Sequence, residues 1–283
     1  MLTATDLFPA SFDPISYLDQ FQSFRAIPSL EESVNLSQHQ NSPHSAVDPT
    51  NFLPFPPDLG DLARLHWLVT SRSVLTVLEF GTGFSTVVFS DALFHNRESL
   101  DQQLPSLLRR QEKFEIHSID NNQFWLDSFR TRFFSEAVFP SNLHLHKCDL
   151  DVSHFNGRVC TYYDPLPDLC PDLIYIDGPD QFSSQGSLRG ISTRHPDRMP
   201  MSGDLLALEH FLQPGTLVVI DGRSANARFL TSNLQRNWSY LYIPEFDQHF
   251  LELQEDPLGR FNAAFIDFTL GDSYYQRMSR HPV

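Results

Sequence analysis

The sequence predicts one doubly wound α/β domain, a mostly parallel sheet of about seven strands with helices on both faces. The chain has 283 residues, a length that allows one large α/β domain or two small ones. From residue 58 onward, short apolar runs alternate with segments of helical periodicity, the pattern of a parallel sheet covered by helices. A hydrophobic content of 41%, with 25 Phe residues, is enough for a sizeable core and excludes a disordered chain.

Residues 1–57 differ from the rest of the chain. They are rich in Pro, Ser, Asn and Phe and have little periodicity, which predicts an irregular arm or lid rather than a separate domain. The sequence leaves open whether this arm covers a site or packs on a second subunit. Asp58 is a suitable N-cap, and Leu62 and Leu65 follow at helical spacing, so we expect the main domain to occupy residues 58–283.

The main domain divides into alternating predicted strands and helices. The predicted strands are the apolar runs at residues 74–80, 115–120, 143–148, 173–177, 216–221, 239–243, 250–253 and 261–268. The predicted helices lie at residues 58–71, 85–94, 123–134, 204–212 and 225–237. The polar residues 96–112 are expected to be a surface insertion or a second helix. The last strands follow one another without a helix, which suggests a terminal antiparallel hairpin.

The charge balance narrows the class of partner. Asp and Glu number 35 against 20 Lys and Arg, and the net charge of −15 disfavours attraction to nucleic acid or anionic membranes. No apolar run approaches the roughly 18 residues of a membrane span, and the N-terminus lacks the pattern of a signal peptide. We therefore expect a cytoplasmic protein with a small-molecule partner. The three cysteines match no zinc-binding spacing, and whether the chain forms a homo-oligomer stays open.

Acidic residues follow the predicted strands with unusual regularity. Each of the first five strands ends in or is followed by a carboxylate: Glu79, Asp120, Asp149, Asp177 and Asp221. Ligands of doubly wound sheets bind outside the carboxyl ends of the strands, so these residues are candidates for one site. A single Asp at such a place commonly caps the next turn or helix, and the argument depends on the five together.

A glycine turn follows the first predicted strand, in the segment VLEFGTGFST at residues 77–86. Gly81 and Gly83 permit a tight turn and a close approach of a ligand to the N-terminus of a helix. A dinucleotide-binding loop would read G-x-G-x-x-G, but Thr86 occupies the place of the third glycine. The charge of Glu79 would also lie close to a pyrophosphate. The turn therefore suits a ligand with a cation and no phosphate, such as S-adenosylmethionine.

The segments EFGTGFST, SIDNN, KCDLD, YIDGPD and PGTLVVIDG together resemble the class I S-adenosylmethionine-dependent methyltransferase family over about residues 60 to 270. They are most similar to small bacterial members whose loop reads G-x-G-x-S-T and whose fourth strand ends in I-D-G. This resemblance implies a Rossmann-like fold, S-adenosylmethionine as cofactor, and methylation of a small or sugar-like hydroxyl compound. It does not decide between O- and N-methylation.

The resemblance also assigns cofactor-binding residues by position. The methionine part would be held by Glu79, Gly81, Thr82, Gly83, Ser85 and Thr86. The ribose would bind Asp120 or, in another strand register, Asn121, because a carboxylate offers two acceptor oxygens. The adenine would lie beside Asp149 and Leu150, and the methyl group beside Asp177 and Gly178. Ser85 departs from the pattern, since many relatives have Gly there.

The stretch from Asp177 to Asp221 is the candidate substrate segment, and it contains a long polar loop at residues 181–203. Asp177 and the loop residue His195 are both candidates for the base that removes a hydroxyl proton. The arginines suited to an anionic substrate are Arg189, Arg194 and Arg198 on this loop and Arg223 after the fifth strand. A solvated loop without a role is the alternative interpretation, because long irregular loops are either functional or disordered.

Three alternatives remain at the level of the sequence. The first is a divalent metal held by Asp177 or Asp180 together with Asp221, as in some O-methyltransferases that the chain resembles. Those relatives carry Asp-Asn after the fifth strand, whereas this chain has Asp221-Gly222, so the sequence disfavours a metal. The second is an oxidoreductase that binds NAD(P). The third is a catalytically silent cofactor-binding protein, because fold does not fix function.

Overall fold

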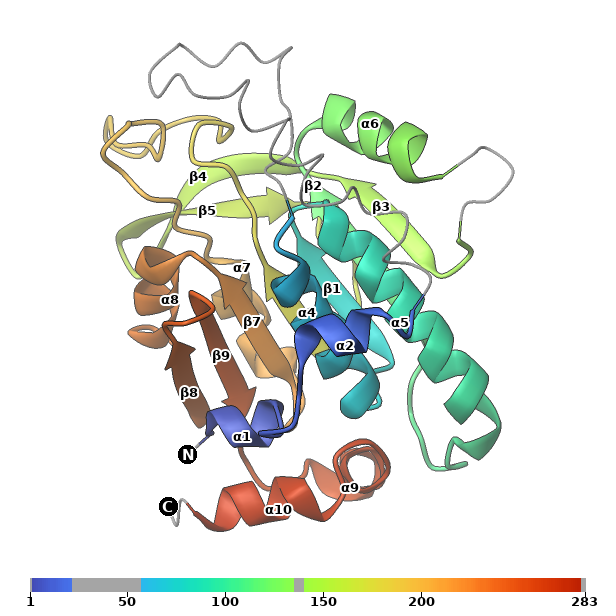
Figure 1. Ribbon diagram of the computed structural model, residues 1–283. Helices are drawn as coiled ribbons and strands as arrows, with labels where there is room; N and C mark the ends of the chain where they lie inside the picture. The colour runs from blue at the N-terminus through green and yellow to red at the C-terminus, as the bar shows by residue number, and fades with distance from the viewer. Residues whose placement is uncertain (1, 22–56, 135–139, 281–283) are drawn as a thin grey trace.

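A seven-stranded, mostly parallel sheet forms the centre of the computed structural model, which describes residues 2–21, 57–134 and 140–280 (Figure 1). The strand order is β3-β2-β1-β6-β7-β9-β8. All neighbouring pairs from β3 to β7 are parallel, and β9 is antiparallel to both β7 and β8. The strands are β1 (Thr76–Phe80), β2 (Glu115–Asp120), β3 (Leu143–Lys147), β6 (Leu173–Ile176), β7 (Leu217–Asp221), β8 (Trp238–Ile243) and β9 (Gln248–Leu253). The predicted fold class is confirmed.

Helices cover both faces of this sheet. Val77 of β1 packs with the apolar side chains of α4 and α5, whereas its neighbour Leu78 packs on the other face with those of α7 and α8. This alternation follows from the two-residue period of a strand. The helices are α1 (Ala4–Leu7), α2 (Pro14–Leu18), α4 (Leu59–Ser71), α5 (Phe84–Leu100), α6 (Gln123–Phe133), α7 (Asp204–Leu208), α8 (Ser224–Thr231), α9 (Gly259–Thr269) and α10 (Asp272–Ser279), with short 3-10 helices at Asp101–Gln103 and Glu209–Phe211.

The last predicted strand, residues 261–268, is wrong, because this segment lies in helix α9. Its buried side chains are Asn262, Phe265, Ile266 and Thr269, and their spacing has the period of a helix rather than of a strand. The antiparallel hairpin at the end of the sheet is formed by β8 and β9 alone. The segment 96–112 is also divided, because α5 continues to Leu100 and a short 3-10 helix follows.

A second, two-stranded sheet was not predicted. It consists of the antiparallel strands β4 (Asp149–Phe155) and β5 (Arg158–Asp164). The connecting residues Asn156 and Gly157 both have positive φ, at 47° and 77°. An Asn-Gly pair between two segments of alternating polarity is a strong indication of a hairpin, so the sequence itself contains the pattern that predicts this one.

The first described residues pack against the main domain. Leu2, Leu7 and Phe8 are buried in the core beside α4, and the indole N–H of Trp67 donates to the carbonyl of Leu7 at 2.9 Å. The rest of the predicted arm, residues 22–56, lies outside the described residues. All three cysteines are free thiols. None of the described helices combines the length and the apolar character that crossing a bilayer requires.

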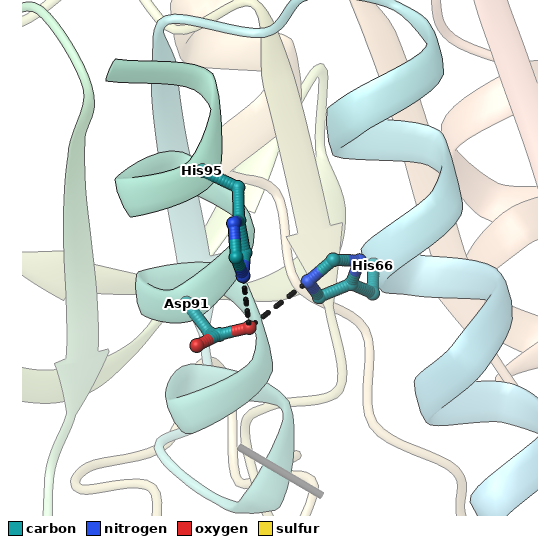
Figure 2. Close-up of side chains that lie close together, drawn as sticks. All are labelled: His66, Asp91 and His95. Atoms are coloured by element: carbon teal, nitrogen blue, oxygen red, sulfur yellow. Dashed lines mark hydrogen bonds and ion pairs between the residues drawn. The ribbon is translucent and has the colours of Figure 1, made fainter. Parts of the chain in front are cut away.

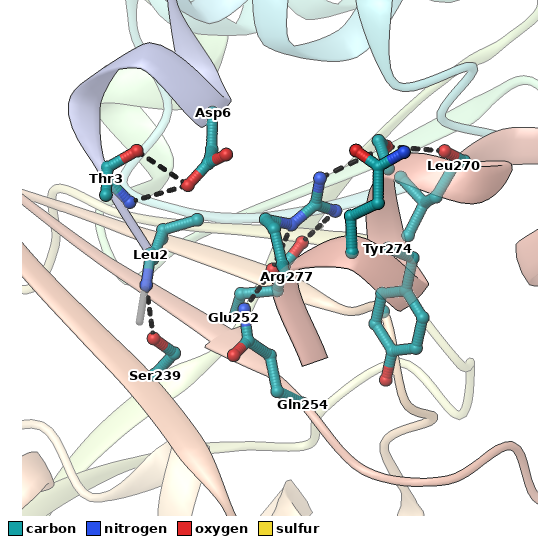
Figure 3. A network of polar contacts seen from close by, with 12 residues as sticks. Leu2, Thr3, Asp6, Ser239, Glu252, Gln254, Leu270, Tyr274 and Arg277 are labelled. Carbon is teal, nitrogen blue, oxygen red and sulfur yellow. Dashed lines mark hydrogen bonds and ion pairs between the residues drawn. The ribbon is translucent and has the colours of Figure 1, made fainter. Parts of the chain in front are cut away.

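A buried ion cluster fastens helix α10 to the sheet (Figure 3). Glu252 of β9 is completely buried and accepts hydrogen bonds from Arg72, at the end of α4, and from Arg277 of α10, all at 2.8 Å. Gln254 donates to the same carboxylate at 2.7 Å. The two arginines hold the pKa of Glu252 at about 2 despite its burial. The Glu252 carboxylate therefore connects three elements that are distant in the sequence, namely β9, the end of α4 and α10.

Candidate functional site

Four of the five acidic residues lie at one edge of the sheet. Glu79, Asp120, Asp177 and Asp221 are at or just beyond the carboxyl ends of β1, β2, β6 and β7, which are adjacent strands in the order β2-β1-β6-β7. The register pairs Phe80 with both Ile119 and Ile176, so the strands end at the same level. Asp149 differs, because it is the first residue of β4 in the separate hairpin.

The glycine turn after β1 packs against the turn that follows β6. Gly81 has a φ of 102°, and its N–H donates to the carbonyl of Ile119 at 2.8 Å. A Cβ at Gly81 would lie 2.9 Å from the backbone nitrogen of Gly178, so the two turns touch through backbone atoms. At Gly83, the N-cap of α5, an added Cβ would meet no atom within 4 Å. The backbone is therefore approachable at Gly83.

The Glu79 side chain binds the first residues of α5, directly after this turn. Its side chain is completely buried, and its carboxylate accepts hydrogen bonds from the hydroxyls of Ser85 and Thr86, both at 2.5 Å, and of Ser118 at 2.6 Å. Burial raises the pKa of Glu79 to about 7, and the three hydroxyl groups oppose this shift. The predicted direct contact with a ligand does not fit this burial. Glu79 instead shapes the turn through the hydroxyl groups of α5.

Asp120 connects the glycine turn to the end of β2. One carboxylate oxygen accepts the N–H of Asn122 at 2.8 Å, and the other accepts the N–H of Thr82 at 3.3 Å. Burial raises the pKa of Asp120 to about 6. Asn121, the alternative from the other register, donates from Nδ2 to the carbonyl of Ser183 at 3.5 Å. Asp120 is thus the residue that faces the turn, with lone pairs left for two hydroxyl groups.

The residues predicted to lie at an adenine differ in their accessibility. Asp149 is exposed and pairs with Lys147 at 3.0 Å. Leu150 is 1% exposed and belongs to the core, and its carbonyl accepts the N–H of Gln185 at 2.7 Å. Leu150 therefore has no surface to offer a ligand in this arrangement.

Asp177 lies at the mouth of the site, held by Arg223. The guanidinium donates to the carbonyl oxygens of Asp177 and of Pro179, the latter at 2.7 Å, and lies 3.6 Å from the Asp177 carboxylate. The Asp177 side chain keeps 50% of its surface exposed, yet its carboxyl group is packed densely enough for burial to raise its pKa to about 7. Arg223 opposes this shift, and the charge of Asp221 adds to it.

Asp221 is bound on both sides. Its Oδ2 accepts the hydroxyl of Tyr175 at 3.0 Å, and its Oδ1 accepts the amide of Gln248 at 3.1 Å. Burial raises the pKa of Asp221 as well. Two groups of three side chains in the described part of the chain could hold a metal ion, and neither includes Asp177, Asp180 or Asp221. The residues present at this edge thus do not form a three-ligand site.

Sequence reasoning missed two residues of α4 at this edge. Asp61 is paired with Arg64, and the Arg64 guanidinium lies 3.8 Å from the centre of the Phe246 ring. Burial raises the pKa of Asp61 to about 6, Arg64 opposes this shift, and the charge of Asp221 adds to it. The sequence predicts the N-cap of α4, but it does not predict that the first turn of this helix lies close to Asp221 at the end of β7. Asn226 in α8 is a further buried polar residue there, 1% exposed and without a hydrogen bond to any described side chain or backbone group.

The long loop at residues 178–203 is attached to the β4–β5 hairpin. The N–H of Val152 donates to Gln185, and that of Thr161 to Met201, both at 2.8 Å. The predicted substrate arginines Arg189, Arg194 and Arg198 are exposed on this loop. Arg194 and Arg198 donate to carbonyl groups of the loop itself, at 3.2 and 2.6 Å.

His195 is also half exposed on the loop, where its Nδ1 accepts the N–H of Asp197 at 3.2 Å. The observed hydrogen bonds of these loop residues thus stabilise the loop. Arg223 is the predicted arginine that contacts Asp177.

Comparison with known proteins gives structural likeness only. No protein-family model and no curated protein sequence matches this chain. Among solved structures, it is similar to the methyltransferase PaMTH1 of Podospora anserina bound to SAH, with 12% identity, a TM-score of 0.42, and coverage of 81% of this chain and 97% of that chain. The O-methyltransferase of Bacillus cereus in complex with SAH has 14% identity, a TM-score of 0.37, and coverages of 84% and 98%.

A third similar structure is the O-methyltransferase TomG of Streptomyces achromogenes, involved in tomaymycin synthesis and solved in complex with SAM. It has 14% identity, a TM-score of 0.41, and coverage of 89% of this chain and 99% of that chain. With every TM-score below 0.5, these likenesses identify neither the family of this chain nor its ligand. The function has to be argued from its own residues.

Proposed function

We propose that this protein is an S-adenosylmethionine-dependent methyltransferase that acts on a hydroxyl group of a small molecule. The observation that supports this most is the pairing of the approachable turn at Gly83 with the carboxylate of Asp120, which already binds that turn through Thr82. A carboxylate at the end of the neighbouring strand suits a ribose with two free hydroxyls. The turn itself suits a ligand portion without phosphate.

The residues of the turn fit the proposed cofactor in shape and charge. Gly81, Thr82 and Gly83 would hold its methionine part against the start of α5, and Asp120 would accept both ribose hydroxyls. Glu79, completely buried, would position Ser85 and Thr86 rather than touch the ligand. Asp149 stays our proposal for the adenine edge, because it is exposed beside the same strand ends.

Asp177 is our proposed general base. S-adenosylmethionine supplies, when bound, an electrophilic methyl group on a sulfonium. Asp177 would accept the proton of the substrate hydroxyl as the oxygen forms its bond to the methyl carbon and the carbon–sulfur bond breaks. A base with a pKa near the working pH is effective in this role, and the pKa of Asp177 is about 7. Arg223 would keep its carboxylate in place, and alignment of the reactants would supply most of the rate.

The main alternative is an NAD(P)-binding oxidoreductase. Thr86 stands where a dinucleotide loop has its third glycine, and its hydroxyl is occupied by Glu79 at 2.5 Å. A further alternative is a protein that binds the cofactor without catalysis, and a measurement of methyl transfer by the wild type and by Asp177→Asn distinguishes it from an enzyme. Asp180, Arg194, Arg198 and His195 make their hydrogen bonds within the loop, and Arg189 is exposed on it, so the proposed mechanism gives these residues no step.

A thermal unfolding experiment separates the two ligand classes. A ligand that binds the folded state raises the unfolding temperature in proportion to ln(1 + [L]/Kd). We expect S-adenosylhomocysteine to raise the midpoint in a concentration-dependent manner, and NAD to leave it unchanged. A shift with NAD alone, or with neither compound, would contradict the proposal.

A further inference from the structure

A cluster of metal-ligating side chains lies between helices α4 and α5, away from the acidic edge (Figure 2). Asp91 and His95 are four residues apart on α5 and so share one face of that helix, and His66 faces them from α4. The Nε2 atoms of His66 and His95 lie 3.1 and 3.5 Å from the same oxygen of Asp91. All three ligand atoms lie within 4.8 Å of one another.

The two nitrogen–oxygen separations, 3.1 and 3.5 Å, are close to those of a tetrahedral zinc site. With Zn–N and Zn–O bonds of about 2.0 to 2.2 Å, the ligand atoms around one ion lie roughly 3.3 to 3.6 Å apart. The rings of His66 and His95 are inclined at 65° to each other, so they are not stacked. The other three-residue group, Glu115, His117 and His144, differs in this respect, because its two rings are stacked with their planes at 21°.

A second shell of hydrogen bonds orients His66 for this role. The hydroxyl of Tyr17 lies 2.7 Å from Nδ1 of His66 and 3.0 Å from the hydroxyl of Thr70. Thr70 in turn donates to the backbone carbonyl of His66 at 3.1 Å. A proton on Nδ1 can therefore donate into a continuous chain of acceptors, which leaves the lone pair on Nε2. Metal-binding histidines are usually held by such a bond from the other ring nitrogen.

The three proposed ligands differ in how far their side chains are exposed to solvent. The side chain of His66 is completely buried. Asp91 is 23% exposed and His95 44% exposed, which gives an ion a path of entry and room for a water ligand. The ring of Phe21 lies 4.2 Å from that of His66 and 5.0 Å from that of His95, and shields them.

We propose that His66, Asp91 and His95 bind one Zn²⁺ ion, with a water molecule as the fourth ligand. Two imidazoles and one carboxylate at tetrahedral spacing favour zinc over the hard cations Mg²⁺ and Ca²⁺, which take oxygen ligands. The ion joins α4 to α5, and through Tyr17 it also stabilises the contact of α2 with α4. The site is independent of the proposed methyltransferase activity.

The test uses the full chain after treatment with a chelator. Co²⁺ is titrated in first, because its visible absorption reports four-coordinate binding, and Zn²⁺ is then added to displace it. We expect one ion per chain. His95→Ala should weaken binding at least about 10-fold because a ligand is lost, and Tyr17→Phe about 10-fold because the second shell is lost. His144→Ala is the matched control and should bind as the wild type does.

Three results would overturn the proposal. The first is a wild-type chain that takes up no stoichiometric ion. The second is a His95→Ala variant that, while still folded by circular dichroism, binds Co²⁺ as tightly as the wild type. The third is a His144→Ala variant that loses affinity as His95→Ala is expected to, since the ion would then lie at the β2–β3 group.

Discussion

The carboxyl groups at the edge of the sheet have different tasks because their surroundings differ. Glu79 is enclosed by three hydroxyls, Asp120 by two backbone N–H groups, and Asp177 by one guanidinium at the open mouth. The sequence predicted that carboxylates would gather here, because the strand ends could be located from apolar runs. It could not predict which would be buried, since Ser118, which binds Glu79, comes from another strand.

At this scale we predict that Asp177 sets the pH dependence of turnover. The initial rate of methyl transfer should rise with pH through about 7 as Asp177 loses its proton. Asp177→Asn should lower the rate by at least about 100-fold, the usual contribution of a general base, and abolish that rise. Rates measured from pH 5.5 to 8.5 check this, with the exposed Asp168→Asn as control. An Asp177→Asn variant that keeps the rise would point to another base, such as His195.

At the scale of secondary-structure elements, the turns after β1 and β6 touch through their backbone atoms at Gly81 and Gly178. The sequence predicted the glycine turn after β1 but not its neighbour, because Gly178 is far along the chain and reaches Gly81 only when β1 and β6 pair. The first turn of α4 is subject to the same limit, because its approach to Asp221 depends on the tertiary arrangement. Helix α9 is different, because the helical spacing of its buried residues is a local pattern that the strand prediction for residues 261–268 overlooks. Local patterns located the elements, whereas their contacts depend on the tertiary arrangement.

The two glycines of the turn should respond differently to the same substitution. Gly81→Ser adds a side chain at a φ of 102° and 2.9 Å from Gly178, and should destabilise the protein by roughly 1 to 3 kcal/mol. Gly83→Ser places a favourable N-cap in open space and should change stability by less than about 0.5 kcal/mol. Gly83→Ser should nevertheless weaken S-adenosylhomocysteine binding. Denaturant unfolding of both variants measures the difference, and equal stabilities would contradict the geometry.

The ion cluster at Glu252 gives a prediction for helix α10. Glu252→Gln leaves two buried arginines without their counter-charge, so we expect a loss of about 3 to 5 kcal/mol in the free energy of unfolding. Glu255→Gln is the control, because its pair with Arg236 is partly exposed and should cost no more than about 1 kcal/mol. Urea denaturation of the two variants compares them. Similar losses would mean that α10 does not depend on this charge.

Buried acidic groups, three of them at the strand ends and Asp204 at the start of α7, also set how the stability of the whole molecule depends on pH. Burial raises the pKa of Glu79 and Asp177 to about 7 and of Asp120 and Asp204 to about 6, in a chain with a net charge of −15. The folded state therefore binds these protons more tightly than the unfolded chain does. Stability must then fall as the pH rises between the unfolded and the folded pKa values.

We predict that the free energy of unfolding decreases from about pH 4.5 to about pH 7, the window of Glu79. Glu79→Gln removes one titrating group and should flatten this decrease, although the variant also loses hydrogen bonds to Thr86 and Ser118. Below pH 4.5 the sign reverses for Glu252, whose pKa of about 2 makes its ion pairs weaken as it is protonated. Denaturant titrations at several pH values test the slope. A stability that rises from pH 5 to 7 would contradict it.

The central claim, a cofactor site formed by the glycine turn and Asp120, is tested most directly by calorimetric titration with S-adenosylhomocysteine at pH 8, where Asp120 is ionised. We predict one site per chain in the wild type. Asp120→Asn should weaken binding at least about 10-fold, because hydrogen bonds to a charged acceptor contribute about 1.5 to 3 kcal/mol each. The exposed Asp127→Asn on α6 should bind normally. Wild-type protein that takes up no S-adenosylhomocysteine, or an Asp120→Asn variant with unchanged affinity, would contradict the account.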